Sequence, residues 1–365
     1  MAEGTGNCGR VLRNASTGLS EKELISELSA KLEQETAEDS FSGAVLIARN
    51  GAPIFAEAYG LVDRERATRN TVQTRFRLGS INKMFTGVAT LQLVEAGKLR
   101  VDDPLGKYLT DFPQKKVATK VTVEHLLNHT SGTGDIFGPE FDARRMQLRT
   151  LSDFAKLQGD KGLRFEPGTR WEYSNYGFIL LGVLIEKVSG QTYYDYVRDH
   201  IYLPAQMWSS GSEPEDTFLP DRSIGYTRAA GTTFRPSTGL LPYLRPNTES
   251  LPYRGSSAGG GYSTVHDLLG FTNAVQQSKL LPPSLTEMLN TGKVETDHST
   301  HYGYGFEHYT NNGAHWIGHT GGAIGMNGDL EFCPELGYTV VSLANLDPPS
   351  AGRIARFIIT SLSIK

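Results

Sequence analysis

Strand-forming segments lie at both ends of this 365-residue chain, and helix-forming segments occupy its middle. Residues 41–60 (FSGAVLIARNGAPIFAEAYG) contain two apolar runs joined by Asn50-Gly51, a dipeptide typical of a two-residue β-hairpin turn. Residues 314–346 contain three further strand-like runs, AHWIGHT, NGDLEFC and YTVVSLANL. Strands so far apart in a chain can share one antiparallel sheet, so the pattern predicts an α+β fold.

Helix signals stand at both ends of the chain as well. Residues 20–38 are predicted to be helical, because Ser20 and Glu23 have capping-box spacing and leucines recur every four residues behind them. A last helix is predicted after Pro349. We expect these terminal helices to cover the sheet.

The middle of the chain has a different character. Helical pieces such as VEHLLNH and YGFILLGVLIEKVSG alternate with loops, and the Pro- and Gly-rich stretch after Pro204 predicts long surface loops. The length suggests about two domains. We therefore expect an α/β domain of residues 1–95 and 256–365, with a mainly helical domain of residues 96–255 inserted into it. A further helix is predicted to begin at Thr264. Because a cleft between two domains is a common place for a small-molecule site, we expect the site between these two domains.

The charge balance, the apolar runs and the cysteines of the chain exclude several classes of protein. The chain has 36 Lys and Arg against 40 Asp and Glu, a balance that argues against nucleic acid as a partner. The longest apolar run, residues 178–185, is too short to cross a bilayer. The N-terminus lacks the apolar stretch of a signal peptide, so we expect a cytoplasmic chain or a mature form whose signal was removed. Cys8 and Cys333 are expected to be free thiols.

Ser80 and Lys83 form the single S-x-x-K pattern of the chain, at the start of a helix predicted to run to about Glu95. A serine hydroxyl needs a base to become a nucleophile, and residues three apart on a helix share a face. The N-terminus of a helix also directs backbone N–H groups at developing negative charge. The spacing suits a self-activating nucleophile, although a serine beside a solvated lysine would give the same pattern.

Two further motifs follow in order, Tyr173-Ser174-Asn175 and His319-Thr320-Gly321. The series S-x-x-K, Y-x-N and H-x-G resembles the serine β-lactamase and penicillin-binding family, which includes class C β-lactamases, DD-peptidases and family VIII carboxylesterases. The segments LLNHTSG and EPGTRWEYSNYGFILLGVLIEKVSG are similar to the linking segments of these enzymes. The resemblance covers roughly residues 40–347. It implies the β-lactamase/transpeptidase-like fold, with an antiparallel sheet, terminal helices and an inserted helical domain.

The resemblance also implies roles for the first two motifs. Ser80 would be the acylated nucleophile, and Lys83 would help to deprotonate it. Tyr173 would shuttle protons and activate the deacylating water, since the E-x-x-L-N motif of class A enzymes is absent. Asn175 would hydrogen-bond Lys83 or the substrate amide. Tyr173 could instead be an ordinary buried tyrosine with a satisfied hydroxyl.

The third motif, His319, Thr320 and Gly321, would lie on an edge strand that lines the site. The oxyanion donors would be the backbone N–H groups of Ser80 and Gly322. His319 stands where many β-lactamases have a lysine that faces the substrate carboxylate. A free imidazole has a pKa near ~6.5, so the histidine would lose its charge above neutral pH. Neutral short-chain esters are therefore predicted to be better substrates than β-lactams near pH 8.

The other motifs give weaker evidence for a catalytic or metal-binding site. Residues 255–259 (GSSAG) fit G-x-S-x-G with Ser257 as nucleophile, but that motif needs a strand before it and a helix after it. Pro252 and further glycines surround it, so it is predicted to be a loop close to the site. The histidines include pairs with short spacings, yet no H-E-x-x-H is present, and we expect neither a metal nor a cofactor. His125 and His129 are expected to brace the LLNHTSG turn.

The sequence therefore predicts a serine hydrolase that works through an acyl-enzyme on a small-molecule ester or amide. A carboxylesterase with weak or no β-lactamase activity fits best. A β-lactamase, a D-alanyl-D-alanine carboxypeptidase and, more remotely, a non-catalytic peptide-binding or scaffold protein are the alternatives.

Overall fold

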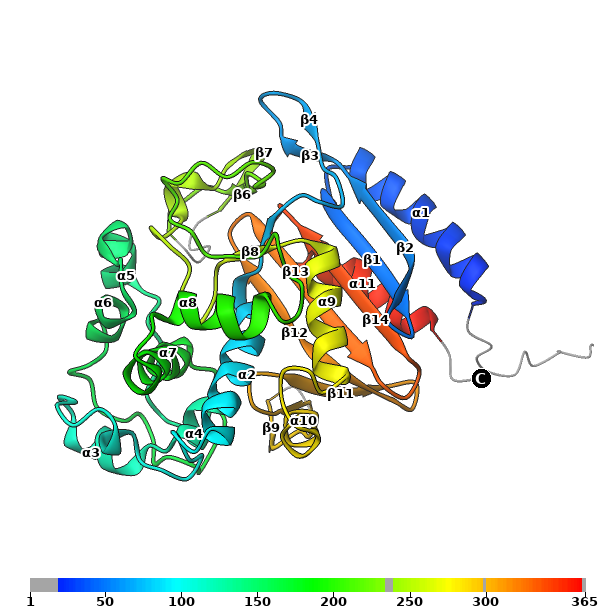
Figure 1. The fold of residues 1–365 in the computed structure, drawn as a ribbon. Helices are drawn as coiled ribbons and strands as arrows, with labels where there is room; N and C mark the ends of the chain where they lie inside the picture. The colour runs from blue at the N-terminus through cyan, green and yellow to red at the C-terminus, as the bar shows by residue number, and fades with distance from the viewer. Residues whose placement is uncertain (1–18, 234–238, 298–299, 363–365) are drawn as a thin grey trace, which may run out of the picture.

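An eight-stranded sheet lies at the centre of the computed structural model, which describes residues 19–233, 239–297 and 300–362 (Figure 1). Its strand order is β2-β1-β14-β13-β12-β11-β10-β9, and the paired neighbours run antiparallel. The first strand of the chain pairs with the last, from Gly43 opposite Ala344 to Arg49 opposite Tyr338. This arrangement confirms the predicted α+β fold, in which the two ends of the chain build one sheet.

The strands of this sheet are β1 (Gly43–Arg49), β2 (Ala52–Tyr59), β9 (Val294–Glu295), β10 (His301–Tyr302), β11 (Glu307–Asn311), β12 (Ala314–Ala323), β13 (Met326–Cys333) and β14 (Tyr338–Ala344). Small two-stranded pairs are β3 (Leu61–Asp63) with β4 (Thr68–Arg69), β5 (Phe76–Arg77) with β8 (Tyr262–Ser263), and β6 (Tyr226–Ala229) with β7 (Leu240–Pro246).

The helices are α1 (Glu21–Ala37), α2 (Asn82–Glu95), α3 (Lys115–Lys120), α4 (Val123–Leu127), α5 (Pro139–Arg144), α6 (Leu151–Lys156), α7 (Asn175–Ser189), α8 (Tyr193–Val197), α9 (Val265–Gln276), α10 (Pro283–Leu289) and α11 (Ser350–Ser361). Short turns of 3₁₀-helix are η1 (Gly79–Ile81), η2 (Leu105–Lys107), η3 (Arg145–Gln147) and η5 (Thr248–Ser250), and η4 (Arg198–Tyr202) is π-helical.

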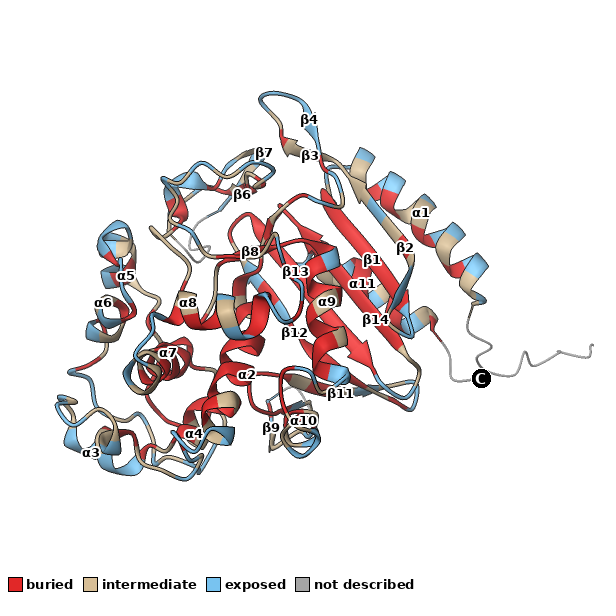
Figure 2. Ribbon diagram, in the orientation of Figure 1, coloured by how far each residue is buried: buried red, intermediate tan, exposed pale blue. Residues whose placement is uncertain are grey.

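Helices cover both faces of the sheet. Strand β1 has Val45 and Ile47 in the apolar layer with α1 and α11, whereas Leu46 lies in the layer with α2 and α9. Residues on a strand alternate between faces, so a strand covered on both sides must be apolar throughout. This explains why β1 is apolar from Gly43 to Ala48 and why β14 carries only small polar side chains among its apolar ones; Figure 2 shows both strands largely buried.

Local signals in the sequence produce the elements they predict. The Ser20 hydroxyl accepts a hydrogen bond from the backbone N–H of Glu23, and the Glu23 carboxylate accepts one from the backbone N–H of Ser20. This capping box starts α1. Asn50 and Gly51 have φ angles of 50° and 78°, as a tight turn between right-twisted strands requires, and they join β1 to β2.

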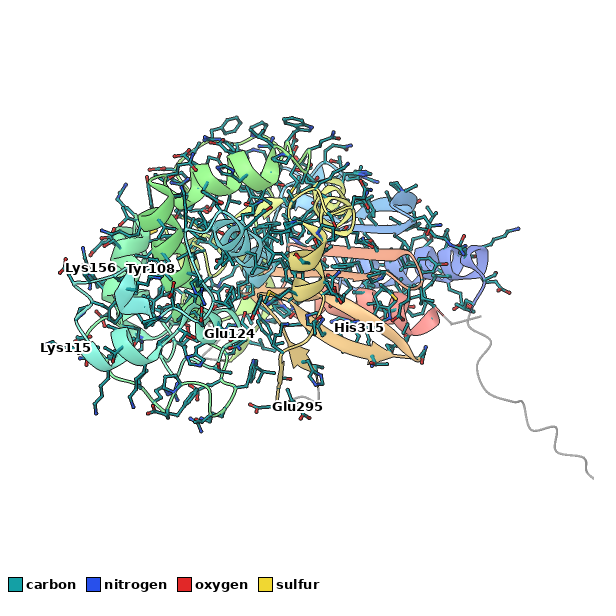
Figure 3. All side chains as sticks on the ribbon, turned by 60° about the horizontal axis from the view of Figure 1, so that its bottom comes forward. Tyr108, Lys115, Glu124, Lys156, Glu295 and His315 are labelled. Atoms are coloured by element: carbon teal, nitrogen blue, oxygen red, sulfur yellow. The ribbon has the colours of Figure 1, made fainter. Side chains whose placement is uncertain are left out.

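The helices α3 to α8 gather beside the sheet, on the left of Figure 1. Helix α7 is buried along most of its length and packs against α2, α4 and α6. Figure 3 shows Glu124, on α4, between Lys115 of the same helical part and the strand that carries His315. The Tyr304 hydroxyl donates to Glu124 Oε1 at 2.6 Å and links the two parts. The bounds of an inserted domain stay a prediction.

Two expectations about this middle region need correction. The stretch after Pro204 was expected to form open loops, but it contains the antiparallel pair β6–β7. Helix α2 begins at Asn82 rather than Ser80, because Gly79 has a left-handed φ of 54° and the chain first makes the short turn η1.

Cys333 is a buried free thiol on β13, and Cys8 lies outside the described residues. None of the helices in the described ranges is long and apolar enough to span a membrane.

Candidate active site

Ser80 and Lys83 lie next to each other at the start of α2. The Lys83 ammonium Nζ is 3.1 Å from Ser80 Oγ, so the predicted pairing is present. Ser80 lines a cavity of about 450 Å³, whereas Lys83 has no exposed surface. The hydroxyl therefore faces a space where a substrate can bind, and the amine lies behind it.

Lys83 is held by two further acceptors. Its Nζ donates to Asn175 Oδ1 at 2.7 Å and to the backbone carbonyl of Ala258. The nitrogen also lies 4.8 Å from the ring centroid of Tyr173, within cation–π range. A buried ammonium is costly unless such partners surround it. These two acceptors leave the third position of the nitrogen facing Ser80 Oγ, so the amine in its neutral form can accept the serine proton there.

Tyr173 and Asn175 flank Ser174, which caps the N-terminus of α7. The Ser174 hydroxyl accepts from the N–H of Gly177 at 2.9 Å, and the Ser174 N–H donates to His129 Nδ1 at 3.1 Å. The imidazole of His129 packs on the Tyr173 ring with centroids 4.2 Å apart. Burial holds the pKa of His129 well below its usual range, so the ring is neutral and can accept this bond. His129 thus braces the second motif.

His125 has a more local role. Its Nδ1 accepts a hydrogen bond from the N–H of Thr122 at 3.2 Å, and the Thr122 hydroxyl accepts from the N–H of His125. This reciprocal pair caps α4, which leads into the LLNHTSG turn as expected.

Strand β12 brings the third motif against η1. It is an interior strand rather than the predicted edge strand, but β11 pairs with it only as far as Gly318. The remaining residues, His319 to Ala323, extend past β11. A Cβ added to Gly321 would overlap the carbonyl oxygen of Leu78 and lie 3.1 Å from the backbone nitrogen of Ser80. Only glycine permits this approach of strand to turn.

The same approach places the two proposed oxyanion donors close together. A Cβ added to Gly79 would lie 2.8 Å from the backbone nitrogen of Gly322. Gly322 and Ser80 both line the cavity, as the sequence predicts for a donor pair. Gly79 was not singled out from the sequence, because its left-handed φ and its contact with a distant strand leave no local pattern.

His319 does not face the cavity. Its ring is buried between strands, where Nδ1–H donates to the carbonyl of Thr320 and Nε2 lies 2.9 Å from the Tyr302 hydroxyl. Burial and, to a lesser extent, the charge of Lys83 lower the pKa of His319 to about 3. The expectation that His319 titrates near neutral pH beside the substrate is therefore wrong. Thr320 and Gly321 also lie outside the cavity wall.

The cavity wall is mainly apolar. Its large side chains are Ile136, Phe137, Phe141, Phe154, Leu240 and Leu251, and Ser80, Tyr173 and Asn175 supply polar groups. Two arginines also contribute. Arg77 is paired with Glu215 at 2.5 Å, and Arg254 stacks 3.4 Å from the Tyr194 ring centroid and donates to the Ser212 carbonyl. Such a wall suits an uncharged, apolar group next to the serine.

The glycine-rich segment around residues 255–260 is the loop that the sequence predicts beside the site. Gly255, Gly259 and Gly260 line the cavity. Ser257 is fully buried against α7, where a Cβ added to Gly182 would overlap its hydroxyl. No strand precedes and no helix follows this loop directly, so the G-x-S-x-G pattern is not a nucleophile elbow.

Metal-binding side chains do not converge in the part of the chain that the structure describes. No group of three His, Cys, Asp or Glu residues there could hold an ion. His315 Nε2 lies 3.3 Å from His308 Nδ1, apart from His319, and His298 is outside the described residues.

An antiparallel sheet between helices, with a serine at a cavity and a buried lysine behind it, is the arrangement of the β-lactamase/transpeptidase-like fold. The Beta-lactamase family model matches residues 28–362, and the chain belongs to this family.

Relatives of known sequence and structure agree with this assignment. The chain is 31% identical over 278 residues to PbpX of Bacillus subtilis (strain 168), which is named as a penicillin-binding protein. The match covers 76% of this chain and 64% of that protein, so the chain spans less than two thirds of this relative. A penicillin-binding protein from Bacillus halodurans superposes with a TM-score of 0.78 at 33% identity, covering 89% of this chain and 97% of that one. A D-stereospecific amidohydrolase from Streptomyces superposes with a TM-score of 0.74 at 26% identity, covering 91% and 98%.

Proposed function

We propose that this serine hydrolase is a carboxylesterase that cleaves small, uncharged esters through an acyl-enzyme on Ser80. The observation that carries the proposal is the 3.1 Å contact between Ser80 Oγ and Lys83 Nζ at a cavity whose wall is mainly apolar.

The reaction needs two proton transfers in each half. The neutral amine of Lys83 takes the proton of the Ser80 hydroxyl as Oγ bonds to the ester carbonyl carbon, and this proton is relayed through Tyr173. The backbone N–H groups of Ser80 and Gly322 stabilise the oxyanion, and Tyr173 returns a proton to the departing alcohol. Water then adds to the acyl carbonyl while Tyr173 accepts its proton. The carboxylic acid leaves, and Ser80 regains its hydrogen.

The third motif and Arg77 give an anionic substrate no unpaired positive charge. His319 is neutral and turned away, so the third motif offers no cation to a substrate carboxylate. Arg77 is already paired with Glu215. An uncharged ester loses nothing from this arrangement, and the phenylalanines of the wall can bury an apolar acyl group.

A β-lactamase or D-alanyl-peptide hydrolase is the second candidate. Arg254 lines the cavity and makes no ion pair with any described residue, so it could meet a carboxylate there. The names of the penicillin-binding relatives point to the same class of substrate.

A side-by-side assay of p-nitrophenyl esters and a chromogenic cephalosporin tests the choice. We expect a higher kcat/KM for the esters at pH 7.5. Efficient cephalosporin hydrolysis that falls in the Arg254→Met variant would replace the esterase with the second candidate.

A serine-reactive phosphonate tests the nucleophile. Mass spectrometry of the digested protein should locate the adduct on Ser80 alone. Ser80→Ala should be inactive and unlabelled, and the control Ser257→Ala should behave as wild type. Activity retained in Ser80→Ala, or an adduct on Ser257, would overturn the proposal.

A further inference from the structure

We propose that Asp135 is a positioning residue that fixes the side-chain amide of Asn175 and, through it, the amine of Lys83. The inference rests on the proposed function, since it concerns the activation of Ser80.

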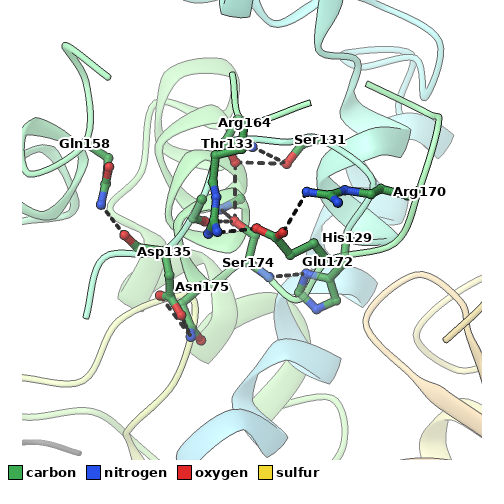
Figure 4. Close-up of polar contacts among 12 residues, drawn as sticks. His129, Ser131, Thr133, Asp135, Gln158, Arg164, Arg170, Glu172, Ser174 and Asn175 are labelled. Carbon is green, nitrogen blue, oxygen red and sulfur yellow. Dashed lines mark hydrogen bonds and ion pairs between the residues drawn. The ribbon is translucent and has the colours of Figure 1, made fainter. Parts of the chain in front are cut away.

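Three side chains form a chain of contacts that ends at the serine. Asn175 Nδ2 lies 3.2 and 3.1 Å from the two carboxylate oxygens of Asp135. Asn175 Oδ1 accepts from Lys83 Nζ at 2.7 Å, and the same nitrogen lies 3.1 Å from Ser80 Oγ. Figure 4 shows the contact between Asp135 and Asn175. Asn175 is almost fully buried, although it contributes to the cavity wall.

The chemistry of the partners determines which way the Asn175 amide points. A carboxylate can only accept hydrogen bonds, and an N–H of Lys83 is donated to the oxygen of the Asn175 amide. The amide must therefore turn its NH₂ toward Asp135 and its oxygen toward Lys83. Without Asp135, the charge-assisted bond that favours this rotamer is absent, and the amide can flip so that its NH₂ rather than its oxygen faces Lys83. The carboxylate thus selects the orientation that holds Lys83 beside Ser80.

Asp135 is itself firmly placed. Its Oδ1 accepts from the backbone N–H of Ile136 at 2.7 Å, and its backbone carbonyl accepts from the Gln158 side chain (Figure 4). The carbonyl of the preceding Gly134 accepts from the Ser174 hydroxyl at 2.5 Å. Gly134 and Asp135, in the segment before α5, are thereby hydrogen-bonded to Ser174 and Asn175 at the N-terminus of α7. A carboxylate anchored in this way can orient its neighbour without moving.

Substitution of Asp135 should lower kcat rather than raise KM, because the residue lies outside the cavity wall. A displacement of about 1 Å in a reacting group can cost on the order of 100-fold in rate. For Asp135→Ala we expect kcat on p-nitrophenyl butyrate to fall by about 10- to 100-fold. Asp135→Asn keeps one acceptor oxygen for the Asn175 amide and should retain more activity than the alanine variant. Asp111→Ala, which removes an exposed carboxylate, is the matched control.

A double-mutant cycle separates positioning from a general effect on the loop. If Asp135 acts through Asn175, then Asp135→Ala should cost little further activity once Asn175→Ala is present. A merely structural role would give the same loss in both backgrounds. Additive losses, or wild-type kcat in Asp135→Ala, would overturn the inference.

An exchange of the two side chains gives a second test that does not depend on the alanine variant folding. Asn175→Asp alone sets two carboxylates about 3 Å apart, the present separation of amide and carboxylate, and should be strongly impaired. Adding Asp135→Asn restores a donor facing an acceptor, so the double variant should recover at least tenfold in kcat. No recovery would count against the inference.

Phosphonate labelling distinguishes the two levels of failure. A wild-type protein that is not labelled on Ser80 would overturn both the proposed function and this inference. Labelled Ser80 with an additive cycle would overturn the inference alone.

Discussion

The buried, neutral His319 makes a quantitative prediction about stability and pH. Its pKa is lowered to about 3 in the folded protein, chiefly by burial, whereas an unfolded chain has a histidine pKa of about 6.5. The folded state therefore disfavours the charged ring. The stability that this histidine contributes is complete above pH 6.5 and is lost as the pH falls toward 3.

The size of the effect follows from the two pKa values. At pH 5.0 the unfolded histidine is charged and the folded one is neutral, and each pH unit below 6.5 costs about 1.4 kcal/mol, or about 2 kcal/mol in all. His319→Gln cannot titrate and avoids this cost. At pH 7.5 the variant should be less stable than wild type, because packing and the contact with Tyr302 are altered. Between pH 7.5 and 5.0, its free energy of unfolding should rise by about 2 kcal/mol relative to wild type.

Urea unfolding followed by tryptophan fluorescence at the two pH values measures this difference. The other buried ionisable groups, among them His308, titrate in both proteins and largely cancel. His266→Gln, on the exposed side of α9, is the control for the removal of a histidine as such. If the difference between His319→Gln and wild type is independent of pH, the ring takes up its proton as readily folded as unfolded, and the reasoning from burial is wrong.

Three further substitutions test the site. Tyr173→Phe keeps the ring on His129, so the melting temperature should be unchanged while kcat falls by about 10²- to 10⁴-fold; equal kcat would mean that Lys83 transfers protons without the phenol. Gly321→Ala forces β12 away from Leu78, so both the melting temperature and kcat should fall, and a variant with normal activity would contradict the close approach of strand and turn. Phe141→Ala should cost about 3–5 kcal/mol of stability and shift the preference among p-nitrophenyl esters toward longer acyl chains; an unchanged preference would remove this side chain from the acyl-binding wall.

Local signals in the sequence were sufficient for much of the fold. Asn50-Gly51 predicts its hairpin because the two left-handed φ angles are required by the turn itself. Thr264 predicts the start of α9 because its hydroxyl accepts from the N–H of Asp267, three residues on. The spacing of Ser80 and Lys83 predicts their contact for the same reason, since both lie in adjoining helical turns. Such information is contained within a few residues.

The features that sequence reasoning missed depend on contacts between distant segments. The sequence places His319 beside the substrate, whereas in the structure its ring is buried and contacts Tyr302, and burial and nearby Lys83 lower its pKa. Asp135 gives no local pattern, because the residue that it contacts, Asn175, lies forty residues later. The pairing of β6 with β7 was missed because Pro242 and Pro246 lie within β7, where proline weakens the strand signal.

The order of strands in the sheet also has a consequence for the timing of synthesis. Ser80 lies early in the chain, but β12, which supplies Gly321 and Gly322 to the same site, is translated about 240 residues later. At about 5–20 residues per second, a ribosome takes on the order of 10 to 50 s over that distance. Strand β1 can pair with β14 only later still, because β14 is the last strand in the described part of the chain. The nucleophile is therefore made well before the strand that completes its site, and a nascent chain has no assembled site until β12 has left the ribosome.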